Sequence, residues 1–269
     1  MSAPETAAKV GSAFDLYNVK TRLAPAALVS APLIALGLAA LPLVPPSQRY
    51  WSLVSLGLLS WVALTARDKG NDAQRKLWED WGGAPTTHRL RYRSNASERE
   101  VARRHREIEK AINAPNRLPS KNREVNEPHA ADAEYIAATR RLIDKCREVG
   151  GFSLLDKENR NYGFARNLYS FKRWGIVAAL LGTLGGIIAL VTSIAFNVRV
   201  VGAGAAVATI IISVLMLALW RTVTPKWVKP SADAYADRLM AAAARLSEDW
   251  HKELGTTSPP DASATPSSE

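Results

Sequence analysis

Cysteine and histidine are scarce in this sequence, which has one cysteine and four histidines among its 269 residues. A lone cysteine, Cys146, cannot form an internal disulfide, and scattered imidazoles do not supply the clustered ligands of a zinc site. The histidines are His88, His105, His129 and His251, and we interpret each as a surface residue. The composition therefore indicates neither a disulfide-stabilised secreted protein nor a metalloenzyme, and we expect no cofactor.

Motifs of phosphate binding and covalent catalysis are missing as well. The sequence has no glycine-rich phosphate loop with its lysine, no nucleophile elbow and no paired-cysteine redox motif. The most loop-like stretch is "WGGAPTT" at residues 81–87. A helix end followed by a Pro and Thr helix start explains it better than a phosphate cradle does. We therefore predict a protein that is not an enzyme.

Charge is absent from four long stretches, Leu23–Val44, Tyr50–Ala66, Trp174–Phe196 and Val200–Trp220, which contain 22, 17, 23 and 21 residues. A bilayer core about 30 Å thick requires roughly 20 apolar helical residues, and helices of soluble proteins are seldom apolar on every face for that length. The pattern predicts an all-α polytopic membrane protein with two transmembrane hairpins, and a large soluble helical core is the alternative. The first stretch is too long for a secretory signal and a second span follows at once, so we expect it to be retained.

The basic residues predict the orientation in the membrane. Three precede the first span, and the links within the hairpins contain only Arg49 and Arg199, whereas residues 67–173 contain 24 and the C-terminal segment six. Both termini, the middle segment and Cys146 are therefore expected on the cytoplasmic side of a bacterial inner membrane. The predicted segments are an N-terminal cytoplasmic segment (1–22), transmembrane hairpin 1 (23–66), a basic helical cytoplasmic insert (67–173), transmembrane hairpin 2 (174–220), a cytoplasmic amphipathic helix (221–255) and a disordered tail (256–269).

The predicted spans lack ionisable residues, which argues against a proton-coupled transporter or pump. They contain small residues instead, and these allow helix backbones to approach closely in lipid. The last two spans are joined by only three residues, so we expect them to pack antiparallel through Gly182, Gly186, Gly202 and Gly204. Small residues elsewhere suggest subunit contacts in a homo-oligomer, and they are Ala31, Gly37, Ala40 and Gly57.

Helical periodicity continues outside the predicted spans. A helix is expected to run on from the second span to Gly82, and "SERE" at residues 97–100 has the form of a capping box before an apolar stripe through Val101 and Ile112. A connector at 113–128 leads to a helix that ends at Gly150. After Pro230 we expect a single amphipathic helix over residues 231–254.

The insert has 24 basic and 16 acidic residues, a formal charge of +8. Its arginines are interleaved with glutamates, and basic charge on a membrane-tethered segment complements anionic lipid headgroups. We therefore favour the lipid surface, or a plain solvated helix, over nucleic acid as the explanation of this charge.

The stretch "NRNYGFARNLYSFKRWG" at residues 159–175 precedes the third span. Aromatic and basic residues at the span ends suit the headgroup region, and we expect these to be membrane-interface anchors: Trp51, Lys172, Arg173, Trp174, Trp220 and Trp227. Anchoring does not require Arg160, Asn161, Tyr162 and Asn167, which lie around an expected Tyr-Gly-Phe turn. They are interpreted either as buried polar residues that tie the cytoplasmic helices to the span bundle, or as a switch or pore mouth.

The arrangement of two hairpins, a cytoplasmic insert of about a hundred residues and an amphipathic C-terminal helix resembles the four-transmembrane pore-forming effectors of bacterial anti-phage operons. The stretches "LWEDWGGAPTT" and "ENRNYGFARNL" resemble uncharacterised bacterial membrane proteins instead. In the effector family a partner enzyme makes a signal nucleotide to which the membrane protein responds, and the resemblance implies such a signal here.

Two functions are expected from this reading. In the first, the protein is a non-enzymatic effector that oligomerises and permeabilises the inner membrane when its cytoplasmic part is engaged, by a signal nucleotide or a soluble protein. In the second, it is a membrane-anchored scaffold whose cytoplasmic helices hold a soluble partner protein.

Overall fold

The structure is a computed structural model that describes residues 19–40, 69–115, 117–195 and 200–255, and within these ranges it is helical without any strand. The predicted second span with Trp51 and Gly57, the link between the last two spans and the C-terminal tail lie outside the described residues. The chain divides into two compact units. Unit 1 comprises residues 1–82 and 157–232, unit 2 comprises residues 83–156 and 233–269, and each is described by itself.

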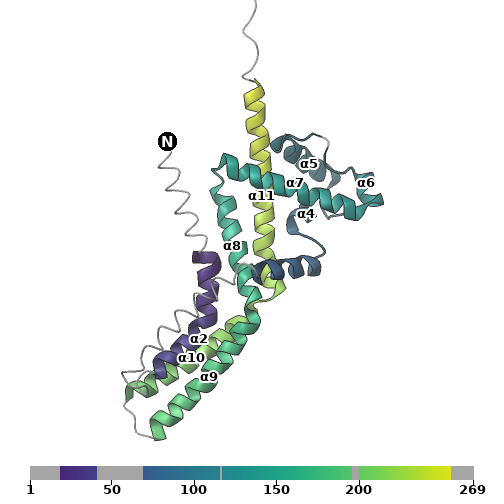
Figure 1. The fold of residues 1–269 in the computed structure, drawn as a ribbon. Coiled ribbons are helices and arrows are strands. Elements are labelled where there is room, and N and C mark those ends of the chain that lie inside the picture. Colours follow the sequence, from purple (N-terminus) through teal and green to yellow (C-terminus); the bar gives the residue numbers. More distant parts are fainter. Residues whose placement is uncertain (1–18, 41–68, 116, 196–199, 256–269) are drawn as a thin grey trace, which may run out of the picture. The chain divides into compact units, whose positions relative to one another are not determined.

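Unit 1 contains three helices that are long and apolar enough to cross a membrane, over Lys20–Ala40, Lys172–Ala195 and Gly202–Thr222. The first is formed by a π-helical turn, η1 (Val19–Leu23), and α2 (Ala24–Ala40); the others are α9 (Lys172–Ala195) and α10 (Val200–Thr222). The three helices run side by side (Figure 1). Large apolar side chains such as Leu184, Ile188 and Leu215 are exposed on α9 and α10, as expected where lipid is the solvent. These helices indicate a membrane protein.

Glycines on α9 bring these helices together. A Cβ atom on Gly182 would collide with the Ser213 hydroxyl of α10, and one on Gly186 would lie 2.8 Å from Ile210. The later glycine of α9, Gly186, thus contacts the earlier residue of α10, Ile210, and the two helices are therefore antiparallel. Gly202 is buried, whereas Gly204 is exposed and a Cβ there would meet nothing within 4 Å among the described residues. Gly204 thus differs from the predicted packing role, because its side of α10 faces away from α9.

Unit 1 also contains a helix over residues 69–80, which ends at two glycines with positive φ, Gly82 and Gly83. Helix α8 (Ser153–Ser170) contains the Tyr162-Gly163-Phe164 sequence in its interior, so the expected turn is wrong. Helix α11 (Pro225–Gly255) begins six residues before the expected Ser231. It starts earlier because the Thr224 hydroxyl accepts a hydrogen bond from the Trp227 N–H, and Pro230 is accommodated within the helix.

Unit 2 is built from α4 (Pro85–Leu90), α5 (Glu98–Ala111), α6 (Lys121–Asn126) and α7 (Pro128–Val149), with the first residues of α8 and the later part of α11. The Ser97 side chain accepts from the Glu100 N–H, which confirms the expected helix start at the capping sequence. Helix α6 lies within the stretch that was expected to be a connector, and Ser120 caps it. The core includes Leu90, Ile108, Tyr135, Leu142 and Leu239, all fully buried.

Candidate functional site around helix α8

The second half of α8 places a buried amide against the turn that precedes the first span. Asn167 is 2% exposed, and its Nδ2 donates to the carbonyl oxygen of Thr21 at 2.6 Å. Thr21 lies in η1, and single π-helical turns within α-helices are frequent at functional sites. A buried amide left without this bond would cost about 1–3 kcal/mol, so the pairing fixes η1 on α8.

Residues 69–80 complete the surroundings of Asn167. A Cβ atom on Gly70 would overlap the Asn167 Oδ1, so the close approach requires a glycine there. Arg166 donates from Nε to Asn167 Oδ1 at 3.4 Å and from Nη1 to Gln74 Oε1. Neither Gly70 nor Gln74 belongs to a local sequence motif, so the sequence alone does not indicate these contacts.

Asn161 and Tyr162 connect α8 to the same two segments. Asn161 accepts from the Lys20 ammonium at 2.9 Å and donates to Glu158 at 3.0 Å. The Trp78 Nε1–H donates to the buried Tyr162 hydroxyl at 3.1 Å, and burial raises the pKa of Tyr162. Arg160 is half-buried and makes no hydrogen bond or ion pair with the described residues, so the structure separates it from its three predicted companions.

We call this polar layer the collar. It consists of Lys20, Thr21, Gly70, Gln74, Trp78, Asn161, Tyr162, Arg166 and Asn167. The collar brings together η1, residues 69–80 and α8, which are far apart in the sequence. Its groups are amides, cations and a phenol that are suited to holding and exchanging hydrogen bonds, and they form no pair of a nucleophile with a base.

The predicted interface anchors occupy different environments. Trp174 is 59% exposed with the Lys69 ammonium 5.1 Å from its ring, Arg173 is exposed, and Trp227 is 40% exposed. Lys172 donates to the Val223 carbonyl oxygen at 2.8 Å. Trp220 differs from the expectation, because its ring is fully buried in the space that Gly175 leaves open, and its Nε1 has no described hydrogen-bond partner.

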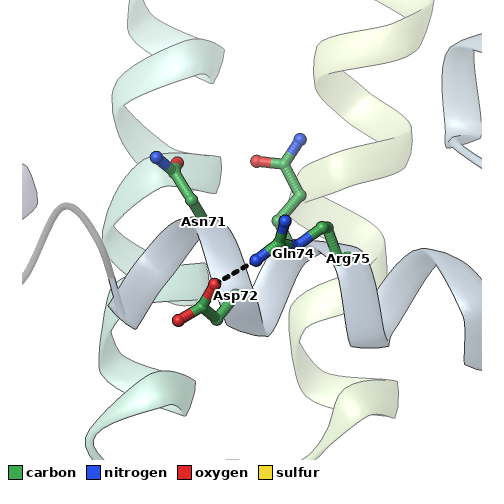
Figure 2. A pocket seen from close by; sticks show the side chains of 4 residues that line it. All are labelled: Asn71, Asp72, Gln74 and Arg75. Atoms are coloured by element: carbon green, nitrogen blue, oxygen red, sulfur yellow. Dashed lines mark hydrogen bonds and ion pairs between the residues drawn. The ribbon is translucent and has the colours of Figure 1, made fainter.

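An open hollow of about 390 Å³ lies along residues 69–80. Figure 2 shows its four lining side chains, Asn71, Asp72, Gln74 and Arg75, of which Asp72 and Arg75 form an ion pair. All four project from one helix, so among the described residues no groups from different elements converge in this lining. The hollow is a surface depression lined in part by the collar residue Gln74.

Unit 2 contains a buried carboxylate that sequence reading missed. Glu124 in α6 is 2% exposed and accepts from the Tyr92 N–H at 2.8 Å, the Arg93 N–H at 3.1 Å and the Tyr135 hydroxyl at 2.7 Å. The Tyr135 pKa is raised by burial and by its bond to Glu124. A glutamate in a polar connector gives no sequence signal of this role, which depends on contacts with residues 92, 93 and 135.

Arginines next to this carboxylate form a network with Asp132. Arg91 makes a two-pronged pair with Asp132, at 2.8 Å for both bonds, and Arg93 reaches Asp132 at 2.7 Å and Glu124 at 3.5 Å. Such a geometry is the strong form of an arginine–carboxylate pair. The network therefore fixes the segment between α4 and α5 on α6 and α7.

His105 is buried, so its interpretation as a surface residue is wrong. Its Nε2 lies 2.8 Å from the Leu90 carbonyl oxygen, which requires a proton on that nitrogen. The apolar stripe that includes Val101 and Ile108 carries the imidazole into the core, and the hydrogen bond satisfies it there.

Comparison with known proteins finds no matching family model, no similar curated protein and no similar solved structure. The described residues hold no group of three or more histidine, cysteine or acidic side chains placed to bind a metal ion. The fold and the collar together define an all-helical membrane protein with a separate helical unit outside its spans.

Proposed function

We propose that the protein is a non-enzymatic, multi-pass protein of the bacterial inner membrane that oligomerises and permeabilises the bilayer when its cytoplasmic part is engaged. The observation that supports this is the collar. It joins by hydrogen bonds the turn that enters the first span, the helix that follows the second predicted span, and the helix that leads into the third.

In this proposal the four predicted spans form two hairpins, and both termini and unit 2 are cytoplasmic. Displacing α8 would exchange the collar hydrogen bonds for others, each worth about 1 kcal/mol net. A layer of several such bonds can hold two arrangements that differ by only a few kcal/mol, which a ligand on the cytoplasmic side can bias. The engaging ligand is a signal nucleotide or a soluble protein, and the acceptor membrane has anionic headgroups.

The second candidate function is a membrane-anchored scaffold that holds a soluble partner protein. It is favoured by the distribution of polar groups in the described spans. Ser30, Ser193, Thr209 and Ser213 are buried between helices, while the exposed large side chains are apolar. These spans therefore present no polar outer stripe that could line a water-filled path between subunits.

Dye uptake and growth arrest on overexpression separate the two functions. The effector admits a membrane-impermeant dye and arrests growth, whereas a scaffold inserts at the same level without either effect. Membrane fractionation supplies the level of inserted protein. Uptake no greater than that caused by an equally expressed inert membrane protein would contradict permeabilisation and favour the scaffold.

Collar variants test whether the collar transmits the signal. The triple replacement of Arg160, Asn161 and Asn167 by alanine is expected to insert and assemble normally but to lose dye uptake. Because Arg160 lacks described partners, Arg160→Ala alone should behave like the parent, and Asn167→Ala alone should carry most of the loss. Lys157→Ala with Asn159→Ala on the same helix is the matched control. A triple variant that permeabilises like the parent would exclude this role.

A further inference from the structure

Helix α5 of unit 2 has one face in the core and the opposite face lined with basic residues. Val101, His105 and Ile108 are buried. At 3.6 residues per turn the residues on the opposite side are Arg99, Arg103, Arg106 and Lys110, spaced i, i+4, i+7 and i+11. The three arginines are exposed, and the row extends over about 16 Å of the helix. We call these four residues the α5 basic face.

The acidic residues of α5 leave Arg99 and Arg106 of this face without an ion pair among the described residues, although they alternate with the arginines in the sequence. Glu100 pairs with Arg104, and Glu98 pairs with Lys121, both away from the basic face. Glu109 accepts from the Leu118 N–H at 2.9 Å. Glu107 reaches the face through Arg103 at 2.9 Å. Arg99 and Arg106 therefore have no ion pair with the described residues.

Three arginines elsewhere in unit 2 are used differently. Arg89 pairs with Asp233 and Asp237, and Arg91 and Arg93 with Asp132. These side chains hold the unit together, so their charges are balanced internally. On α5, by contrast, Arg99 and Arg106 are exposed and have no ion pair with the described residues, so their charges remain available to an external partner.

We infer that the α5 basic face binds the anionic headgroups of a lipid bilayer. A row of exposed cations along one helix face fits an extended surface of many anions better than a single small anion. The same chain has three membrane-length helices, so headgroups are present at a high effective concentration without a separate encounter. The face has no aromatic side chain on which bases could stack, which disfavours single-stranded nucleic acid.

This inference rests on the membrane location alone and not on permeabilisation. It adds to the proposed partner, an anionic bilayer, the helix face that contacts this bilayer. Loss of lipid binding with dye uptake intact, or the reverse, would therefore distinguish failure of one proposal from failure of the other.

The test uses the full chain in nanodiscs of phosphatidylcholine, so that the protein's own bilayer is uncharged. Sucrose-loaded vesicles of phosphatidylcholine with phosphatidylglycerol are added, and co-sedimentation is measured at low and high salt. The parent is expected to bind these vesicles in a salt-sensitive manner and to ignore vesicles of phosphatidylcholine alone. Each basic residue near an anionic surface contributes to the binding free energy. Arg99→Glu with Arg106→Glu should therefore weaken binding to these vesicles about thirty-fold or more.

Arg140→Glu with Arg141→Glu is the matched control, because both residues are exposed on α7 and have no described ion pair. It should bind within about threefold of the parent, given that exposed charges beyond the contact are screened by salt. Arg99→Gln with Arg106→Gln, checked by circular dichroism, guards against a folding defect and should also weaken binding. Equal binding by the parent and both α5 variants, or equal weakening by the control, would overturn the inference. Tighter binding to duplex DNA or RNA than to vesicles would also overturn it and assign the face to nucleic acid.

Discussion

Single residues in unit 2 show how polar groups were accommodated in a helical core. The His105 ring lies between Tyr92 and Tyr135, with centroid distances of 5.1 and 5.4 Å. Burial lowers the pKa of His105, and the bond to Leu90 and the charges of Glu109 and Glu124 oppose this only in part. The folded unit therefore prefers a neutral imidazole.

We expect unit 2 to lose stability on mild acidification. The folded-state pKa of His105 lies below the ordinary value of 6.5, so the unfolded chain binds more protons at that pH and the free energy of unfolding rises with pH. Its contribution is complete above about pH 7 and falls as the pH drops through 6.5 toward the folded-state pKa. Thermal unfolding followed by circular dichroism in detergent should show this fall. In His105→Gln, which retains a donor for Leu90, the dependence over this range should be smaller. An identical pH profile for this variant would assign the acid sensitivity to other groups.

Glu124 should be the most sensitive acidic residue of unit 2. Glu124→Ala leaves two backbone N–H groups and the Tyr135 hydroxyl without their acceptor, while Arg93 keeps Asp132, and each buried polar group left without a partner costs about 1–3 kcal/mol. Glu127→Ala, which removes an exposed carboxylate 3.8 Å from Arg123, should cost no more than about 1 kcal/mol. Chemical unfolding of the two variants compares these values. Similar losses for both would mean that the buried carboxylate is not stabilising.

At the scale of helices, the glycines of α9 and α10 offer an internal comparison. Gly182→Leu and Gly186→Leu should lower stability in detergent, because a branched side chain would force α9 away from α10 and α2. Gly204→Leu should be close to neutral, since a side chain there meets open space among the described residues. Thermal aggregation of the purified variants measures this difference. A loss at Gly204 equal to that at Gly182 would place another helix or subunit against that face.

Helices were predictable from the sequence where a local signal defines them. Uncharged runs marked α9 and α10, the Ser97 capping sequence marked the start of α5, and Gly150 marked the end of α7. Features that depend on tertiary contacts could not be predicted from the sequence. Helix α6 is short and polar and gains its role when Glu124 is buried, and α11 extends through Pro230, which by sequence alone reads as a helix start.

The candidate site shows the same limit. Sequence reading selected Asn161, Tyr162 and Asn167 because anchoring does not explain them, and the structure brings all three into the collar. It could not separate Arg160 from them, because the sequence does not show which parts of α8 are covered by other helices. Nor could it find Gln74 and Trp78, which are about ninety residues away in the sequence and meet α8 only in the folded unit.

For the whole molecule, the distribution of basic residues predicts the topology in the membrane. If both terminal segments and the insert (67–173) are cytoplasmic, 33 of the 35 basic residues lie inside. Cys146 itself is a poor reporter of this, because it is 5% exposed and burial raises its pKa to about 11, which leaves little reactive thiolate. A thiol at an exposed position is needed instead.

Val149→Cys in a Cys146→Ala background supplies such a thiol, since Val149 is 55% exposed at the end of α7. A membrane-impermeant maleimide should leave it unlabelled in intact spheroplasts at low expression and label it after lysis. Ser47→Cys, in the link that the charge distribution places outside, should be labelled in intact spheroplasts and serves as the positive control. The physical reason is that moving unit 2 to the outer face would carry a strongly basic segment across the membrane against the rule that orients such proteins. Labelling of Val149→Cys before lysis would reverse the topology, and with it the cytoplasmic placement on which both proposed functions depend.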